Sequence, residues 1–365
     1  MLDRIRLSDF RNHAATRLEG TGRFNLLIGA NGAGKTNVLE ALSLFAPGRG
    51  LRRAQLSDIA REGADEHASG GFAVGADLVS GVTPVRIGTA VRVDAPGRRI
   101  VQASGAPLPA SRLAEWLSIG WLTPAMDRLF TDSAGNRRRF LDRMVLALDP
   151  VHATHSSRYD KALRERNRLM GGDARPDPQW LDALEREMAE AGAAIAAGRA
   201  ATVARLSEEL ARVRDAPFAR PSLAIEPAAP ADAGELADLW RKGRPADRAA
   251  GRTLVGPHRD DLAVAMSGTG RAAAECSTGE QKAMLIAITL AHAGLAAGSR
   301  PLVLLLDEVA AHLDPVRRAA LYERLAVTGA QVWMTGTEAE PFSSLPERPG
   351  VWRVTAGAAE RLEQV

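Results

Sequence analysis

Cysteine is nearly absent from this chain of 365 residues, because Cys276 is the only one. A single cysteine excludes an intrachain disulfide and favours a reducing compartment. A secretion signal is also missing, since no apolar core follows the charges of the first six residues. The most apolar helical stretch, residues 283–297, is too short to span a bilayer and contains His292. We therefore expect a soluble, cytoplasmic protein without a membrane segment.

A strong net charge is the next feature that the chain lacks. Its 47 Lys and Arg residues against 44 Asp and Glu leave a net charge of +3, which gives no decisive argument for a nucleic-acid partner. Any anion-binding surface must come from local clustering instead. The cations are almost all arginine, since the lysines are only Lys35, Lys161, Lys242 and Lys282. The chain is long enough for two or three domains.

One stretch, residues 29–36, indicates a chemistry directly. It has the pattern GxxxxGK followed by threonine, in the residues Gly29, Ala30, Asn31, Gly32, Ala33, Gly34, Lys35 and Thr36. A buried strand is predicted before it over 24–28 and a helix after it over 37–42, which is the setting of a P-loop. The glycines let backbone N–H groups close around phosphate oxygens, and the helix N-terminus adds a positive dipole end. We expect Lys35 on the β- and γ-phosphates of ATP and the Thr36 hydroxyl on Mg2+.

A second stretch supplies acids that the P-loop lacks. Residues 302–306 are all apolar, which predicts a central strand buried on both faces, and the strand ends in Asp307 and Glu308. Asp307 is expected to hold the magnesium ion through water, and Glu308 to act as general base on the attacking water. An apolar run that ends in two acids is a weak signal alone. Paired with a P-loop in one chain, it is strong.

A third stretch, Ser277-Thr278-Gly279-Glu280, opens a predicted apolar helix and forms a second anion-binding cap. One nucleotide cannot easily use two such caps from one chain, because the P-loop already wraps its phosphates. We therefore expect Ser277 and Gly279 to close over the γ-phosphate held by a second copy of the chain. For this stretch taken alone, a routine helix cap is the alternative interpretation.

The middle of the chain predicts a long helix that begins at Asp177-Pro178. Its apolar residues mostly step by three and four, through Leu181, Leu184, Met188, Ala191, Ile195, Val203, Leu206, Leu210 and Val213. So narrow a seam on so long a helix suggests an antiparallel helical arm, a short coiled coil or bundle. An ordinary helix lying on a domain core is the alternative. Prolines 217, 221, 227 and 230 predict a linker, with a short helix following over 236–240.

Elsewhere the pattern is β over residues 68–102, with separate strands expected at 72–74, 85–87 and 91–93. Further strands are expected over 5–10 and 331–335.

Five arginines in two basic stretches are candidate DNA contacts, and a solvated basic face is at least as good an interpretation for each. They are Arg52, Arg53, Arg137, Arg138 and Arg139.

These motifs together resemble the RecF family of DNA replication and repair proteins, relatives of the SMC and ABC-type ATPase heads. The matching residues are, in chain order, Phe10-Arg11-Asn12, 29–40, Gly48-Arg49-Gly50 with Arg52, 138–142, 256–262, 277–282, Asp307-Glu308 and Leu313-Asp314. The Gly-Pro-His-Arg-Asp-Asp run at 256–261 and the Ser-Thr-Gly-Glu-Gln-Lys run at 277–282 are specific to the family among ATPases.

The resemblance implies an α/β fold: an ABC/SMC-type P-loop ATPase head with a mixed sheet, interrupted by an inserted helical arm domain. The expected domains are a first head part over 1–145, the arm over 146–250 and a second head part over 251–365. The second part holds the signature, the Walker B strand and a D-loop, Ala311-His312-Leu313-Asp314-Pro315. The aspartate of that loop is implied to work across a dimer interface.

The resemblance also implies an ATP-dependent homodimer that binds single- and double-stranded DNA and acts at gaps and stalled forks. Its implied roles are recombinational repair, replication and SOS induction, with weak, DNA-stimulated ATP hydrolysis and the mediators RecR and RecO as partners. Lys35, Thr36, Asp307 and Glu308 are implied to serve the nucleotide in cis, with Lys35 and Glu308 in catalysis. Ser277 and Gly279 are implied to serve it in trans.

The chain departs from ABC patterns at three places. Cys276 stands where signatures usually have leucine, no clear Q-loop glutamine follows Thr123-Pro124, and Gly336-Thr337 replaces the switch histidine of transporters. The alternatives to a DNA clamp are an ABC-type transporter subunit and a structural SMC-like tether. The missing histidine and the inserted arm count against the transporter, and the shortness of the arm counts against the tether.

Overall fold

The computed structural model describes residues 1–61, 71–80, 83–172, 176–212, 217–297, 300–310 and 313–362. Val213 of the predicted seam and Ala311 and His312 of the expected D-loop lie outside these ranges. The chain forms two compact units. Met1–Met126 with Thr289–Val365 make up the first, which we call the sheet unit, and Asp127–Ile288 make up the second, the helical unit.

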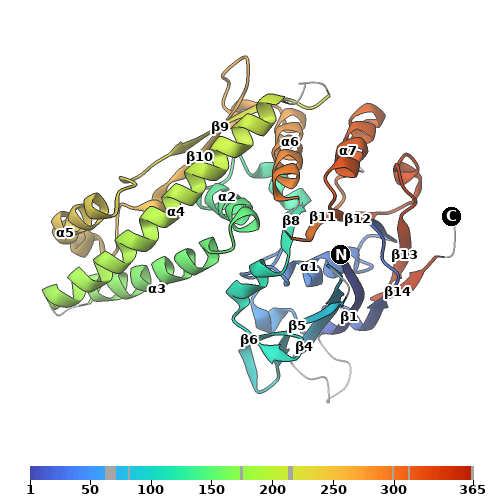
Figure 1. Cartoon of the computed structure of the whole chain (residues 1–365), viewed down its shortest axis with the longest axis horizontal. Coiled ribbons are helices and arrows are strands. Elements are labelled where there is room, and N and C mark those ends of the chain that lie inside the picture. Colours follow the sequence, from blue (N-terminus) through green and yellow to red (C-terminus); the bar gives the residue numbers. More distant parts are fainter. Residues whose placement is uncertain are drawn as a thin grey trace. The chain divides into compact units, whose positions relative to one another are not determined.

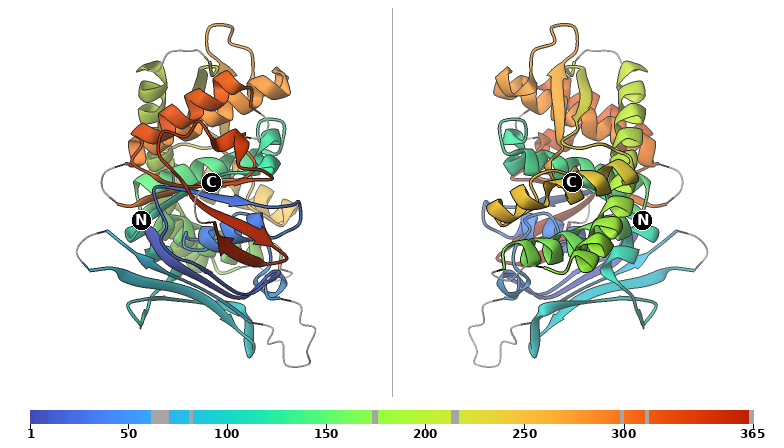
Figure 2. Two further views of the ribbon diagram at one scale, coloured as in Figure 1. Left: turned by 90° about the vertical axis from the view of Figure 1, so that its right-hand side faces the viewer. Right: turned by 90° about the vertical axis from the view of Figure 1, so that its left-hand side faces the viewer.

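The first sheet of the sheet unit is antiparallel throughout, with the strand order β2-β1-β4-β5-β6-β7. Figure 2 shows its blue and cyan strands as a curved layer. The strands are β1 (Leu2–Phe10), β2 (His13–Leu18), β4 (Phe72–Leu78), β5 (Val85–Arg92), β6 (Ala95–Ala103) and β7 (Ala106–Pro107).

The second sheet has the order β14-β13-β3-β12-β11-β8. Its strands pair in parallel from β13 to β8, and only β14 is antiparallel, so the mixed sheet that the sequence predicts is confirmed. The strands are β3 (Phe24–Ile28), β8 (Ser118–Leu122), β11 (Leu302–Leu306), β12 (Gln331–Gly336), β13 (Gly350–Thr355) and β14 (Ala358–Arg361). β3 and β11 are buried along their whole length, as their apolar sequences require.

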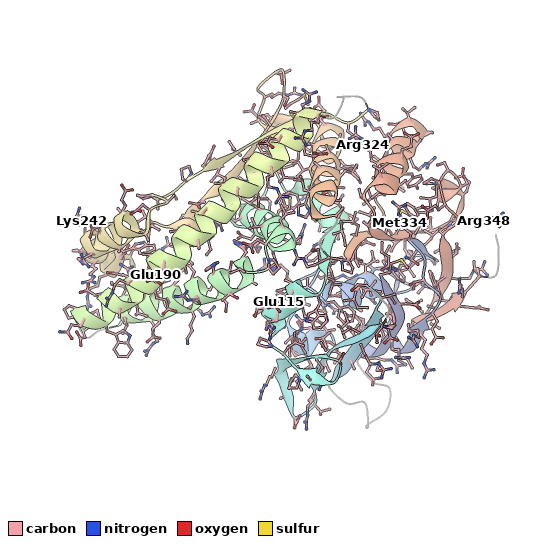
Figure 3. The ribbon with its side chains drawn as sticks, viewed as in Figure 1. Glu115, Glu190, Lys242, Arg324, Met334 and Arg348 are labelled. Carbon is pink, nitrogen blue, oxygen red and sulfur yellow. The ribbon has the colours of Figure 1, made fainter. Side chains whose placement is uncertain are left out.

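Helix α1 (Lys35–Ser43) lies in the core of the sheet unit, with seven of its nine residues buried. One hydrophobic cluster contains residues of α1, of β1 and β4 in the first sheet, and of β11 and β12 in the second. Met334 on β12, labelled in Figure 3, is also buried. The unit also holds α7 (Pro315–Val327). α1 therefore packs in a core to which both sheets contribute.

The helical unit is built around α4 (Pro178–Arg212), which packs against α3 (His152–Met170), α5 (Ala233–Ala250) and the sheet of β9 (Pro221–Glu226) and β10 (Asp261–Met266) (Figure 1). The predicted seam is buried from Leu181 to Leu210, apart from the half-buried Leu184. α4 is therefore the central helix of a small bundle. The unit also holds α2 (Ala134–Leu148), and α6 (Thr278–Ala296) begins within it.

Short 3-10 helices complete the described elements. They are η1 (Leu56–Asp58), η2 (Ala110–Glu115), η3 (Pro124–Arg128), η4 (Pro257–Arg259), η5 (Ala273–Glu275) and η7 (Glu340–Phe342). Across the residues that the structure describes, no helix is long and apolar enough to cross a bilayer. The cytoplasmic location stays a prediction.

Three local predictions were only partly right. The proline stretch is not simply a linker, because Pro221–Glu226 forms β9, whose Leu223 and Ile225 pair with Val264 and Leu262 of β10. Proline is tolerated at the first residue of a strand, and the alternating residues after it favour pairing. The helix expected over 236–240 runs through Pro245 to Ala250. Residues 91–93 do not form a strand of their own, since β5 continues to Arg92.

The compact units have other bounds than the expected domains. α2 and residues 251–288 join the helical unit, because α2 and η4 pack on α4 and because Arg137 of α2 forms a bidentate ion pair with Asp261 of β10 at 2.8 and 2.6 Å. The compact units do not test the expected division into head and arm, which therefore stays a prediction.

The run at 256–261 is tied into this unit by buried polar contacts. Arg199 of α4 donates to Asp260 at 3.0 Å and to the Pro257 carbonyl at 2.7 Å. Burial lowers the pKa of His258 to about 4, so its ring is neutral. The neutral ring accepts from the Tyr159 hydroxyl at 2.7 Å and donates to the Thr253 carbonyl at 3.2 Å. The motif therefore joins α3 and α4 to the start of β10.

Candidate nucleotide site

The P-loop connects the buried strand β3 to α1, and three of its glycines have positive φ angles. These are +154° at Gly29, +81° at Gly32 and +116° at Gly34, a region that side chains with a Cβ rarely adopt. A Cβ at Gly29 would collide with the Val354 carbonyl oxygen, and one at Gly34 would lie 2.7 Å from the Asn12 side chain. Glycine is therefore required here both for the turn and for space.

Lys35 is buried at the first turn of α1 and bends back over the loop. Its ammonium group donates to the carbonyl oxygens of Gly29 at 2.7 Å and Ala30 at 2.9 Å. A flexible lysine can redirect these N–H groups to phosphate oxygens of a nucleotide in the loop. The ammonium group therefore lies against the loop, and its contact with phosphate stays a prediction.

Thr36 and Asp307, predicted from stretches 271 residues apart, lie side by side. The Thr36 hydroxyl is 2.9 Å and 3.1 Å from the two oxygens of the Asp307 carboxylate. Asp307 also accepts from Thr335 of β12 at 2.8 Å. The contact forms because β12 lies between β3 and β11 in parallel pairing, which brings all three carboxyl ends to one edge.

Burial raises the pKa of Asp307. Hydrogen bonds from Thr335 and Thr36 act in the opposite direction but do not cancel this effect. Hydroxyl and carboxylate oxygens are the hard ligands that Mg2+ prefers, so these residues fit the expected ion. Among the described residues no three His, Cys, Asp or Glu side chains cluster as a metal site. Mg2+ usually takes one or two carboxylates and completes its shell with water and phosphate.

Glu308 has a left-handed backbone, with φ +53°, directly after the strand. Its N–H donates to the Thr335 hydroxyl at 2.8 Å, which fixes this conformation. A non-glycine residue in this region costs about 1–2 kcal/mol, and such strain is concentrated at functional sites. The strain is therefore consistent with the catalytic role that the sequence predicts for Glu308.

Residues of the β1–β2 turn and the first residue of β2 contact the P-loop and α1. No role was predicted for these residues from the sequence. The Asn12 amide donates to the Ala33 carbonyl at 2.9 Å, and the His13 ring lies 3.0 Å from the Gly34 carbonyl. Arg11 forms a bidentate ion pair with the fully buried Glu40 of α1 at 2.9 and 2.8 Å. The Phe10-Arg11-Asn12 motif could have pointed to this support.

The turn between β13 and β14 reaches the same loop from the far end of the chain. The Gly357 N–H donates to the Ala33 carbonyl at 3.0 Å, and its carbonyl accepts from the Thr16 hydroxyl at 2.8 Å. Thr16 is in turn 2.8 Å from the ring of His13, whose pKa is lowered by burial. No signal in the sequence marks Gly357, because its partners are more than 300 residues away.

Replacing Gly357 by alanine is expected to weaken ATP binding at least tenfold. A Cβ there would collide with the Asn12 carbonyl oxygen and push the β1–β2 turn against the P-loop. Gly105→Ala is the matched control, because Gly105 has a nearly equal φ of +82° but no atom within 4 Å of its Cβ position. Titration with a fluorescent ATP analogue measures both. Equal affinities in the two variants would show that the turn does not position the loop.

A pocket of about 670 Å³ opens beside the P-loop. Residues 29–33 line one wall, and Glu338, Arg353 and Thr355 are among the residues that line the rest. The pocket gives the exposed outer side of the loop room for a ligand or for a segment of another molecule.

Ser277 and Gly279 belong to the helical unit, where they begin α6. The Glu280 N–H donates to the Ser277 hydroxyl oxygen at 3.3 Å, and the Ser277 N–H donates to the Glu280 carboxylate at 2.8 Å. This reciprocal pair is a capping box, which is compatible with both interpretations of the stretch. Ser277, Thr278 and Gly279 are all exposed, which leaves the cap open to a ligand. Their action on a second copy stays a prediction.

Comparisons with known proteins show what the chain is similar to. The family model for the RecF/RecN/SMC N terminal domain matches residues 1–359. The chain is 47% identical to the DNA replication and repair protein RecF of Mesorhizobium japonicum, with 99% of this chain and 98% of the relative covered. It is 46% identical to the protein of the same name from Agrobacterium fabrum, with 98% and 97% covered.

Two solved structures show the same fold. The recombination mediator protein RecF with ATPrS, in the RecFOR pathway, has a TM-score of 0.85 at 22% identity and covers 100% of this chain and 98% of its own. The Smc head domain from Pyrococcus furiosus, with the C-terminal domain of ScpA, has a TM-score of 0.56 at 15% identity and covers 99% and 95%.

Fold and site together define a P-loop protein of the RecF/RecN/SMC class, with an ABC/SMC-type ATPase fold. Within that class, the chain belongs to the RecF family. This membership confirms the resemblance that the motifs indicated, and it favours DNA repair over the transporter subunit.

Proposed function

We propose that this protein binds ATP at the P-loop, dimerises on ATP and acts on DNA in recombinational repair. The observation that carries the proposal is the contact between the Thr36 hydroxyl and the Asp307 carboxylate, beside a lysine bent over the loop. This arrangement joins the two halves of an ATP site from distant parts of the chain. A solved structure of the recombination mediator protein RecF with ATP supports ATP as the nucleotide.

In this proposal Lys35 and the backbone N–H groups of residues 29–36 bind the phosphates. Thr36 and Asp307 would hold Mg2+, which when bound neutralises charge on the β- and γ-phosphates. Glu308 would take a proton from the attacking water as general base. Ser277 and Gly279 would donate to the γ-phosphate bound by a second copy, so that ATP joins two protomers and its slow, DNA-stimulated hydrolysis releases them.

We further propose that the ATP-bound dimer binds single- and double-stranded DNA at gaps and stalled forks, in repair, replication and SOS induction. The names of the relatives, DNA replication and repair protein RecF, support this role. The RecFOR pathway named for a solved relative supports RecR and RecO as partners.

The DNA part of the proposal is tested by binding to a gapped duplex in the presence of ATP, measured by fluorescence anisotropy at several salt concentrations. Because phosphate contacts release counterions, log K should fall linearly with log salt, with a slope of about −0.9 for each phosphate contacted. Lys35→Met, which removes the cation of the P-loop, serves as the ATP-deficient control. Absence of binding at low salt, or a slope near zero, would contradict the proposal.

A further inference from the structure

Most of the arginines that the sequence marks as candidate DNA contacts are engaged within the fold. Arg52 donates to Asn37 at 2.6 Å and to Glu40 at 3.0 Å. Arg137 forms its bidentate ion pair with Asp261, and Arg138 donates to the Asp260 carbonyl at 2.5 Å. Arg139 donates to Asn136. To bind DNA, these side chains would have to give up contacts that they make within their own unit.

Helix α3 instead presents cations with few or no partners. Ser157, Lys161, Arg164 and Arg168 are spaced by four, three and four residues, so they lie within about 60° of one another around the helix. All four are exposed, whereas Tyr159, Ala162, Arg166 and Met170 on the other side are buried. α3 lies along one side of α4 (Figure 1), which leaves this outer face uncovered within the helical unit.

The charges on this face are mostly unpaired. In the described part of the chain, Lys161 and Arg164 form no hydrogen bond or ion pair, although Asp160 interacts electrostatically with Arg164. Arg168 forms an ion pair with Glu165 of its own helix, at 2.5 Å. Helix spacing places Asp160 and Glu165 on the two flanks, outside the row of cations. Cations held at helical spacing with no internal partner are suited to bind a repeating anion.

We infer that the outer face of α3, Ser157, Lys161, Arg164 and Arg168, binds the phosphate backbone of DNA. The face runs about 16 Å along the helix axis. One strand of B-DNA carries about five phosphates over that length, enough for each of the cations to meet one. Lysine and arginine are charge donors to phosphate, and the serine hydroxyl adds a neutral donor of the kind found at such contacts. The inference rests on the proposed DNA-binding function and adds the surface that performs it.

The test compares two double variants that each remove two exposed positive charges from the helical unit. The first is Lys161→Gln/Arg164→Gln on α3. The matched control is Arg205→Gln/Lys242→Gln, with Arg205 on α4 and Lys242 on α5 (Figure 3). Both carry the same change of net charge, and neither touches the nucleotide site. Thermal unfolding and ATP-dependent sedimentation should be the same in both as in the unaltered protein.

Binding to a labelled gapped duplex is measured from about 50 to 200 mM salt. The α3 variant is expected to bind at least tenfold more weakly at the lowest salt, and its salt slope should be smaller by about 2, since each lost phosphate contact removes about 0.9. The control should keep the affinity and slope of the unaltered protein. If the two variants have the same affinity and salt slope while the unaltered protein binds, the outer face of α3 is not the DNA-binding surface. If the unaltered protein does not bind the duplex at all, the proposed function fails, and the inference fails with it.

Discussion

Replacing Glu308 by glutamine is expected to lower kcat for ATP hydrolysis by about 10²–10⁴-fold while ATP affinity stays within about threefold. The amide keeps the shape of the side chain and cannot take a proton from the attacking water. Binding should survive because the phosphate and metal contacts are proposed to come from the P-loop, Lys35, Thr36 and Asp307. Phosphate release with saturating ATP and Mg2+ measures the effect.

Glu323→Gln is the matched control for this prediction, because Glu323 is an exposed carboxylate on the neighbouring α7. It should hydrolyse ATP at the normal rate. Normal hydrolysis by Glu308→Gln would exclude Glu308 as the general base, and the strained backbone at that residue would need another explanation.

Replacing Arg166 by alanine is expected to reduce the free energy of unfolding by about 3–5 kcal/mol, the usual result of removing one partner from a buried ion pair. Arg166 is completely buried between α3, α4 and α5. It donates to Glu185 at 3.0 Å, and to both Asp247 and Thr253 at 2.7 Å. Arg244 also pairs with Glu185 at 2.6 Å, but no other ion pair to Asp247 is seen in the described ranges. The variant therefore leaves the Asp247 carboxylate buried without a cation.

Urea unfolding followed by circular dichroism measures this loss. Arg168→Ala on the same helix is the control, because its ion pair with Glu165 is exposed to solvent and such pairs contribute little to stability. A loss below about 1 kcal/mol for Arg166→Ala would show that the helical unit does not depend on the buried charges that join its helices.

The nucleotide site was predictable because each half of it is a local pattern. Residues 29–36 need only their own glycines, lysine and threonine to form a phosphate cradle, and Asp307 needs only an apolar strand before it. That Thr36 and Asp307 would meet also followed, since a parallel sheet brings the ends of its strands to one edge. The capping box at Ser277 is likewise contained within four residues.

The supports of that site were not predictable from the sequence. The contacts of Gly357 with Ala33 and Thr16 cross most of the chain, and no periodicity or motif encodes them. The roles of the arginines in the basic stretches were also ambiguous, because the sequence of such a stretch does not show whether its guanidinium groups face solvent or pair with carboxylates. Arg137 and Arg138 were expected at a surface and instead join α2 to the start of β10. Lys161 and Arg164 of α3, for which the sequence analysis made no prediction, are exposed and form no ion pair in the described part of the chain.

The central claim is that ATP held at the P-loop of one protomer is closed by Ser277 of another. Sedimentation velocity of Glu308→Gln with saturating ATP and Mg2+ tests it most directly, because this variant is expected to bind ATP and to hydrolyse it very slowly. We expect a dimer, and a monomer that still binds ATP once Ser277→Arg is added. A dimer that persists with Ser277→Arg, or a Glu308→Gln protein that stays monomeric with ATP bound, would contradict the claim.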